Sequence, residues 1–156
     1  RITLGLLGDH GHTNNSAATV QRMLAADPSY DAIIHAGDIS YANGWQPTWD
    51  TYMDMIQPLA SRNFWMTTVG NHEYVDVPVI GVLPNLKSYD ARFAMPRPNP
   101  PSEIGNGPTS RAHMDSDKAS FATELYYSVD IGPVHVIALN SEVSSFAPNS
   151  TQYEWL

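Results

Sequence analysis

Three short apolar segments of this chain each end at a glycine followed by aspartate or asparagine, and this repeated ending restricts its fold more than any other feature. The segments cover residues 2–7, 32–36 and 63–69, and the pairs that close them are Gly8-Asp9, Gly37-Asp38 and Gly70-Asn71. Short apolar runs bounded by turn residues are typical of strands that are buried on both faces of a parallel sheet.

Helical spacing separates the three segments. Val20, Met23 and Leu24 predict a helix that begins at residue 15 or 16 and ends before Pro28. A second helix is predicted within residues 45–59, with Pro47 in its first turn and Pro58 marking its end. The order strand, helix, strand, helix, strand predicts an α/β fold with a parallel sheet and right-handed crossovers.

The rest of the chain has a different pattern. Residues 75–118 are rich in Pro and Gly and predict a long loop or insert. Residues 123–141 alternate on both sides of Gly132-Pro133, as a hairpin does. Thr151 and Glu154 form a capping-box signature for a helix that would start near the last residue. We therefore expect residues 1–156 to be the N-terminal half of a domain that continues beyond residue 156.

Composition excludes several classes of protein. The formal net charge of −8 argues against non-specific nucleic-acid binding, and the absence of cysteine excludes disulfides and thiolate metal sites. No stretch approaches the roughly 20 apolar residues of a membrane span. Triplets at Asn14 and Asn149 fit N-glycosylation acceptors, which points to a secreted, extracellular or vacuolar protein.

The polar residues that follow the three segments should lie together. In a parallel α/β sheet, ligands bind beyond the carboxyl ends of the strands, so the three endings would share one edge. Carboxylates, an amide and a phenol form an oxygen-rich set that suits hard cations. A bound cation would relieve repulsion between the carboxylates and make the site locally positive, which an anionic substrate needs in a chain of net charge −8.

The motifs GD-x-G at 8–11, GD-x-x-Y at 37–41 and GNHE at 70–73 resemble, in this order, the first three of five motifs of the purple acid phosphatases. These enzymes belong to the calcineurin-like metallophosphoesterase superfamily, and the resemblance covers most of the chain. It implies that Asp9 and Tyr41 bind a ferric ion and that Asp38 bridges two metals. It also implies that Asn71 binds a divalent metal (Zn, Mn or Fe) and that His72 faces the substrate.

One departure from the wider superfamily supports the ferric assignment. Related phosphoesterases usually read Asp-x-His in the first motif, with that histidine on the first metal, whereas this chain has Gly11 there and gains Tyr41. A phenolate adds negative charge, which favours a trivalent ion. Two further family motifs, Val-x-x-His and Gly-His-x-His, are absent, and we expect them after residue 156 or in a second chain.

The other polar residues near these motifs have more modest expected roles. We expect His10 to line the rim of the pocket, His35 to hydrogen-bond beneath the site without binding metal, and Glu73 to orient its neighbours without acting as a base. Structural or surface positions are expected for the remaining histidines: His12, His113 and His135.

The resemblance implies hydrolysis of phosphate monoesters at acidic pH by a binuclear centre of Fe(III) and a divalent metal, with a metal-bound hydroxide as nucleophile. The substrate would be a small phosphorylated molecule, and phytate, nucleotides and phosphoproteins all remain open. Two alternatives remain: a superfamily phosphodiesterase or pyrophosphatase, and a non-catalytic metal-binding chain. A visible purple or pink colour, which the resemblance implies from charge transfer between the Tyr41 phenolate and Fe(III), would separate the first alternative. Metal content and turnover of p-nitrophenyl phosphate by the complete protein would decide the second.

Overall fold

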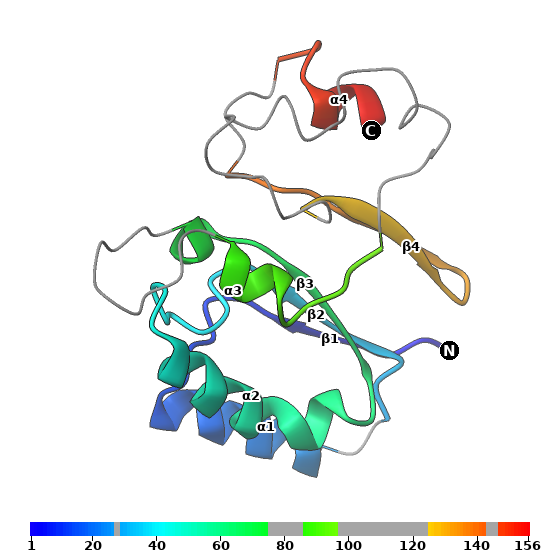
Figure 1. Ribbon diagram of the computed structural model, residues 1–156. Coiled ribbons are helices and arrows are strands. Elements are labelled where there is room, and N and C mark those ends of the chain that lie inside the picture. The colour runs from blue at the N-terminus through cyan, green and yellow to red at the C-terminus, as the bar shows by residue number, and fades with distance from the viewer. Residues whose placement is uncertain (27–28, 75–85, 97–124, 143–146) are drawn as a thin grey trace.

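A three-stranded parallel sheet forms the centre of the computed structural model, which describes residues 1–26, 29–74, 86–96, 125–142 and 147–156. The strands β1 (Leu4–Leu7), β2 (Ala32–Ala36) and β3 (Phe64–Thr68) lie in the order β1-β2-β3. Helices α1 (Asn14–Ala25) and α2 (Gln46–Ala60) connect them and lie together on one side of the sheet (Figure 1). The predicted α/β fold with its alternating order is confirmed.

An antiparallel hairpin lies on the opposite side of this sheet (Figure 1). Its strands are β4 (Tyr127–Ile131) and β5 (Val134–Ala138), joined at Gly132-Pro133 as the alternation predicted. The last element is the short helix α4 (Thr151–Trp155). The helix begins at Thr151, but its N-cap is Ser150, whose Oγ accepts from the backbone N–H of Tyr153, so the capping residue lies one position before the predicted one.

The register of the sheet brings the three strand endings together. Leu7 pairs with His35, and Ala36 pairs with Thr68, so each strand ends beside its neighbour. Because all three strands run in the same direction, their carboxyl ends form one edge. The polar residues that follow β1, β2 and β3 therefore lie together at this edge of the sheet.

The core fills the space between sheet and helices. One face of α2 presents fully or nearly fully buried apolar side chains towards the sheet: Trp49, Tyr52, Ile56 and Leu59. Val20 of α1 and Ile33 of β2 belong to the same cluster. Burying such a side chain contributes roughly 1.5–3 kcal/mol each, so α2 holds the sheet edge rigidly. The helix continues two residues beyond Pro58, which lies in its last turn and does not end it as predicted.

Part of the segment predicted as a long loop belongs to the core. Within residues 86–96, the short helix α3 (Lys87–Asp90) buries Tyr89, and Phe93 and Met95 are buried beyond it. The Tyr89 and Tyr127 hydroxyl groups both reach Thr67 on β3, with Tyr127 Oη donating to its carbonyl oxygen at 2.9 Å. Within the segment predicted as a long loop or insert, residues 86–96 therefore add a short helix and buried side chains to the core. The remaining positions of that segment, 75–85 and 97–118, lie outside the described residues, as does His113.

None of the helices in the described part of the chain combines the length and the apolar composition that crossing a membrane requires.

Candidate metal centre

The loops at the carboxyl edge of the sheet hold an unusual backbone conformation. Asp9, Asp38, Tyr41 and Asn43 all have φ between 48° and 57°, in the left-handed region. Among the described residues, the only other non-glycine residue with positive φ is Leu86. Left-handed conformations cost free energy for residues with a Cβ atom, and in folded proteins they gather at functional sites. The strain marks these two loops as a site.

Three oxygen-bearing side chains converge there. The Tyr41 hydroxyl donates to Asp9 Oδ1 at 3.0 Å and lies 3.4 Å from Asp38 Oδ2. Burial, the hydrogen bond to Asp9 and the charge of Asp38 raise the pKa of Tyr41 to about 12. The phenol therefore keeps its proton unless a cation compensates for the charge. This donor set, two carboxylates and a phenol, fits a hard and highly charged metal ion such as Fe(III).

Two glycines make room for this arrangement. A Cβ atom at Gly11 would lie 3.3 Å from the ring of Tyr41, and Gly11 has φ of +64°. A Cβ atom at Gly70 would overlap with the Asp38 carboxylate. The first glycine lets the tyrosine ring pack over its loop, and the second lets the third loop approach the aspartate. Gly11 and Tyr41 thus occupy space that a histidine at position 11 would need.

Backbone hydrogen bonds join the first loop to the second. Gly11 N donates to the Ile39 carbonyl oxygen at 2.9 Å. The exposed His12 extends this pairing, since its Nδ1–H donates to the Ser40 carbonyl oxygen at 3.1 Å. His12 is therefore a loop residue, as expected, and its role in the structure is to tie the two loops together.

Glu73 joins the second loop to the third. Its buried carboxylate accepts from the backbone N–H groups of Asp38, Ile39 and Gly70 at 2.9, 2.9 and 2.8 Å. Burial raises the pKa of Glu73 to about 7, although the three N–H donors act in the opposite direction. With its oxygens occupied by the main chain, Glu73 orients its neighbours, which is the role its position in GNHE predicted.

Asn71 and His72 begin the short 3₁₀ helix Asn71–Tyr74 that follows β3. The backbone N–H of His72 donates to Asp38 Oδ1 at 3.0 Å, which anchors this turn to the aspartate. The Asn71 side chain is exposed and, within the described residues, makes no hydrogen bond to the three converging oxygens. In the described part of the chain, no three His, Cys, Asp or Glu side chains are placed so that together they could hold a metal ion. The assignment of Asn71 as a metal ligand stays a prediction.

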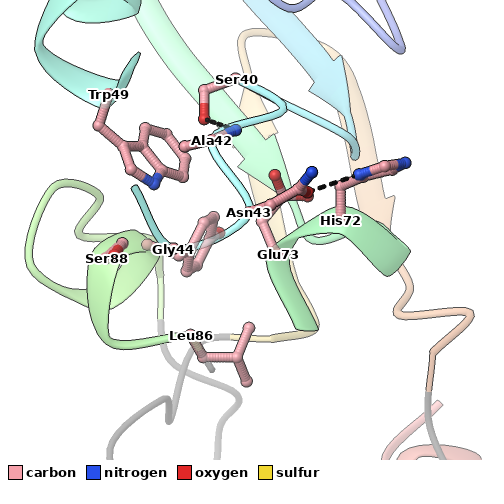
Figure 2. Close-up of a pocket in the computed structure, with 10 residues that line it drawn as sticks. Ser40, Ala42, Asn43, Gly44, Trp49, His72, Glu73, Leu86 and Ser88 are labelled. Atoms are coloured by element: carbon pink, nitrogen blue, oxygen red, sulfur yellow. Dashed lines mark hydrogen bonds between the residues drawn. The ribbon is translucent and has the colours of Figure 1, made fainter. Parts of the chain in front are cut away.

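The ring of His72 is held by a residue that the sequence did not single out. Asn43 Oδ1 lies 2.7 Å from His72 Nδ1, and the rings of Tyr41 and His72 have centroids 4.3 Å apart. Figure 2 shows Asn43 and His72 facing each other at the edge of a pocket. The Asn43-Gly44 pair is a turn signal in the sequence, but a turn signal does not say what the asparagine side chain contacts.

Beneath the first loop lies a buried group of aromatic and imidazole rings. His35 is fully buried, and its Nδ1 is hydrogen-bonded to Tyr52 Oη at 2.9 Å, so its ring links β2 to α2 beneath the site. His10 lines an open pocket of about 500 Å³ beside Asp9 and Tyr41, as expected for a rim residue. Its ring nevertheless turns inward and packs edge-to-face on His35 at 5.8 Å. Burial lowers the pKa of both histidines.

The remaining predicted positions lie at the surface. Asn14 is the first residue of α1 and Asn149 precedes α4, and both are exposed. His135 is also exposed, on β5, where its Nδ1 lies 2.6 Å from Asp130. Glycosylation of the two asparagines stays a prediction that their exposure permits.

A parallel sheet whose carboxyl edge carries Asp, Asp with Tyr, and Asn with His on three successive loops defines a metallophosphoesterase. The chain belongs to the calcineurin-like phosphoesterase family, whose sequence model matches residues 2–156. It is 36% identical over 155 residues to "Probable purple acid phosphatase 20" from Arabidopsis thaliana, covering 99% of this chain and 31% of that protein. It is 28% identical to "Fe(3+)-Zn(2+) purple acid phosphatase 12" from the same plant, over 99% of this chain and 29% of that protein.

The fold has a counterpart among solved structures. A purple acid phosphatase from yellow lupin (Lupinus luteus) seeds superimposes with a TM-score of 0.69 at 24% identity, over 97% of this chain and 26% of that one. The resemblance to purple acid phosphatases predicted from the three motifs is thereby confirmed. The chain spans about a third of the length of the curated relatives it matches.

Proposed function

We propose that this chain supplies part of the active site of an acid phosphatase that hydrolyses phosphate monoesters. The observation that carries the proposal is the convergence of Asp9, Asp38 and Tyr41, which come from two different loops. The Tyr41 hydroxyl oxygen lies 3.0 Å from Asp9 Oδ1 and 3.4 Å from Asp38 Oδ2. Three acidic oxygens so close together repel one another when ionised, and a metal ion is the natural counter-charge.

Each residue then has a role in holding the metals. Asp9 and Tyr41 would bind Fe(III), Asp38 would bridge the two ions through its two oxygens, and Asn71 would bind the divalent ion. The divalent ion is Zn, Mn or Fe, and a relative named as an Fe(3+)-Zn(2+) enzyme supports an iron-containing pair. When bound, the centre would activate water for attack on phosphorus and neutralise the phosphoryl oxygens.

His72 is the residue proposed to act on the substrate. Its main chain is fixed to Asp38 and its ring lies against Tyr41, so the imidazole stands beside the predicted metal ligands. From there it can hydrogen-bond the phosphate and give a proton to the departing alcohol. Reaction at acidic pH is consistent with a proton donor of this kind and with the names of the relatives.

His72→Ala in the full-length protein tests this proposal. We expect turnover to fall by about 10²- to 10⁴-fold for alkyl phosphates, less for p-nitrophenyl phosphate, and metal content to stay normal, because only poor leaving groups need protonation. Loss of metal in this variant would make His72 a ligand. A wild-type protein with two bound metals but no phosphatase activity would rule out the proposed function and favour the non-catalytic alternative.

The cellular setting is also a proposal. Exposed glycosylation acceptors at Asn14 and Asn149 support a secreted or vacuolar glycoprotein. The partners would be a small phosphorylated substrate and the residues that complete the metal shells, with no nucleic acid and no membrane involved. Mass analysis of the glycans on the purified native protein tests the two acceptor sites.

A further inference from the structure

The segment from Asp38 to Asn43 contacts His72 at three points. Asp38 Oδ1 accepts from the backbone N–H of His72 at 3.0 Å, and the Tyr41 ring lies against the imidazole with centroids 4.3 Å apart. Asn43 Oδ1 lies 2.7 Å from His72 Nδ1, the contact drawn in Figure 2. Two of these three residues are predicted metal ligands and the third is not. Asn43 therefore has no role in the proposed function as stated so far, although its hydrogen bond is the shortest of the contacts.

The chemistry of the amide determines the state of the ring. An amide oxygen can only accept a hydrogen bond, so Nδ1 of His72 must carry the hydrogen in this contact. The identity of the protonated nitrogen in an imidazole is set by the hydrogen bond that the other nitrogen makes. With Nδ1–H committed to Asn43, Nε2 is the nitrogen left for the substrate, and the ring cannot rotate without breaking the bond.

The backbone at this position also selects asparagine. Asn43 has φ of 48° and precedes Gly44, whose φ is 85°. Asparagine and aspartate adopt the left-handed conformation more readily than other residues with a Cβ atom, and glycine adopts it freely. The same residue thus turns the loop and aims an oxygen at His72.

We propose that Asn43 is the positioning residue of His72: its amide oxygen accepts the Nδ1 hydrogen and fixes the orientation of the ring, so that Nε2, which carries the second proton of the imidazolium, faces the phosphate and the leaving group. This inference rests on the proposed function of His72 and extends it to a residue outside the three motifs. It also makes one loop responsible for both the metal geometry and the placement of the proton donor.

Two variants of the full-length, metal-loaded protein separate the amide from the backbone. Asn43→Gly removes the oxygen and tolerates positive φ, while Asn43→Asp keeps an oxygen acceptor on the same backbone. We expect Asn43→Gly to lower kcat about 10- to 100-fold for alkyl phosphates and less for p-nitrophenyl phosphate, which is part of the roughly 10²- to 10⁴-fold that a positioned proton donor supplies. Asn43→Asp should lose much less, and both variants should keep their metals.

A double-mutant cycle tests whether Asn43 acts through His72. In the His72→Ala background, Asn43→Gly should cost no further activity, because the ring that it orients is gone. Additive losses would overturn the proposal, and so would loss of metal from Asn43→Gly or wild-type kinetics in that variant.

A binding measurement keeps the inference separate from catalysis. Calorimetry with inorganic phosphate on the metal-loaded protein should show weaker binding to Asn43→Gly than to the wild type. The His72→Ala variant and the double variant His72→Ala with Asn43→Gly should bind phosphate equally well. This readout needs no turnover. An inactive wild type would therefore refute the proposed function, whereas equal phosphate binding by wild type and Asn43→Gly would refute the role of Asn43.

Discussion

Replacing His35 with asparagine should make the protein more tolerant of acid. The His35 ring is fully buried and hydrogen-bonded to Tyr52, and burial, with a smaller contribution from the charge of His10, lowers its pKa from 6.5 to about 3. In the unfolded chain the ring is free in water and takes up a proton near pH 6.5. The folded state is therefore penalised as the pH falls from 6.5 towards 3.

The size of the penalty follows from the two pKa values of His35. Each pH unit below the unfolded pKa costs about 1.4 kcal/mol while the folded ring stays neutral, so about 2 kcal/mol is lost between pH 7 and pH 5. Asparagine has no titrating group, and its side-chain nitrogen or oxygen can still reach Tyr52. The variant will be less stable than the wild type at pH 7, because a smaller side chain leaves a cavity. That deficit should shrink by about 2 kcal/mol at pH 5.

Urea unfolding of the full-length protein at pH 7, 6 and 5 measures this change. Tyr52→Phe is the matched control, because it removes the same hydrogen bond but keeps His35 as a titrating group. Its loss of unfolding free energy relative to the wild type should therefore not become smaller towards pH 5, whereas that of His35→Asn should. If the His35→Asn deficit is the same at pH 5 and pH 7, the ring is protonated in the folded protein or accessible to water, and the reasoning fails.

Three further predictions concern the metal centre. Tyr41→Phe should abolish the visible colour of the metal-loaded protein while its fold, followed by circular dichroism, is retained, because the ring still packs and only the phenol oxygen is lost; a variant that stays coloured contradicts the ligand assignment. Asp38→Asn should lose more activity than Asn71→Ala, since a bridging group serves both metals; equal losses with both metals retained would argue against bridging. Gly70→Ala should lower metal content and cost roughly 1–3 kcal/mol in urea unfolding, because its Cβ would overlap with the Asp38 carboxylate; normal metal content would show that the loop can adjust.

The order of strands and helices was predictable because it depends on local patterns. Apolar runs closed by Gly-Asp or Gly-Asn gave the three parallel strands, and their common edge followed from the direction of the strands. Local patterns did not reveal the features that tertiary contacts decide. Tyr89 and Met95 lie in a segment rich in turn residues, and only their packing against Thr67 shows that it belongs to the core.

The residues of the candidate site that lie in motifs were predictable, but the contacts of their neighbours were not. Motif spacing identified Asp9, Asp38 and Tyr41, and the structure brings their oxygens together. Asn43 escaped notice because its contact with His72 joins residues 29 positions apart, and a turn signal accounts for an Asn-Gly pair without invoking any partner. The inward turn of the His10 ring was missed for the same reason, since its neighbours come from β2 and α2.

The packing of Gly11 against Tyr41 has a consequence for how such a site can arise in evolution. A histidine at position 11 would need space that the tyrosine ring fills, and it would have to adopt the left-handed backbone that Gly11 has. A change from a first-motif histidine to this tyrosine therefore involves both positions together. Reverting Gly11 alone would press a side chain against the Tyr41 ring, and reverting Tyr41 alone would remove the phenol oxygen from the site.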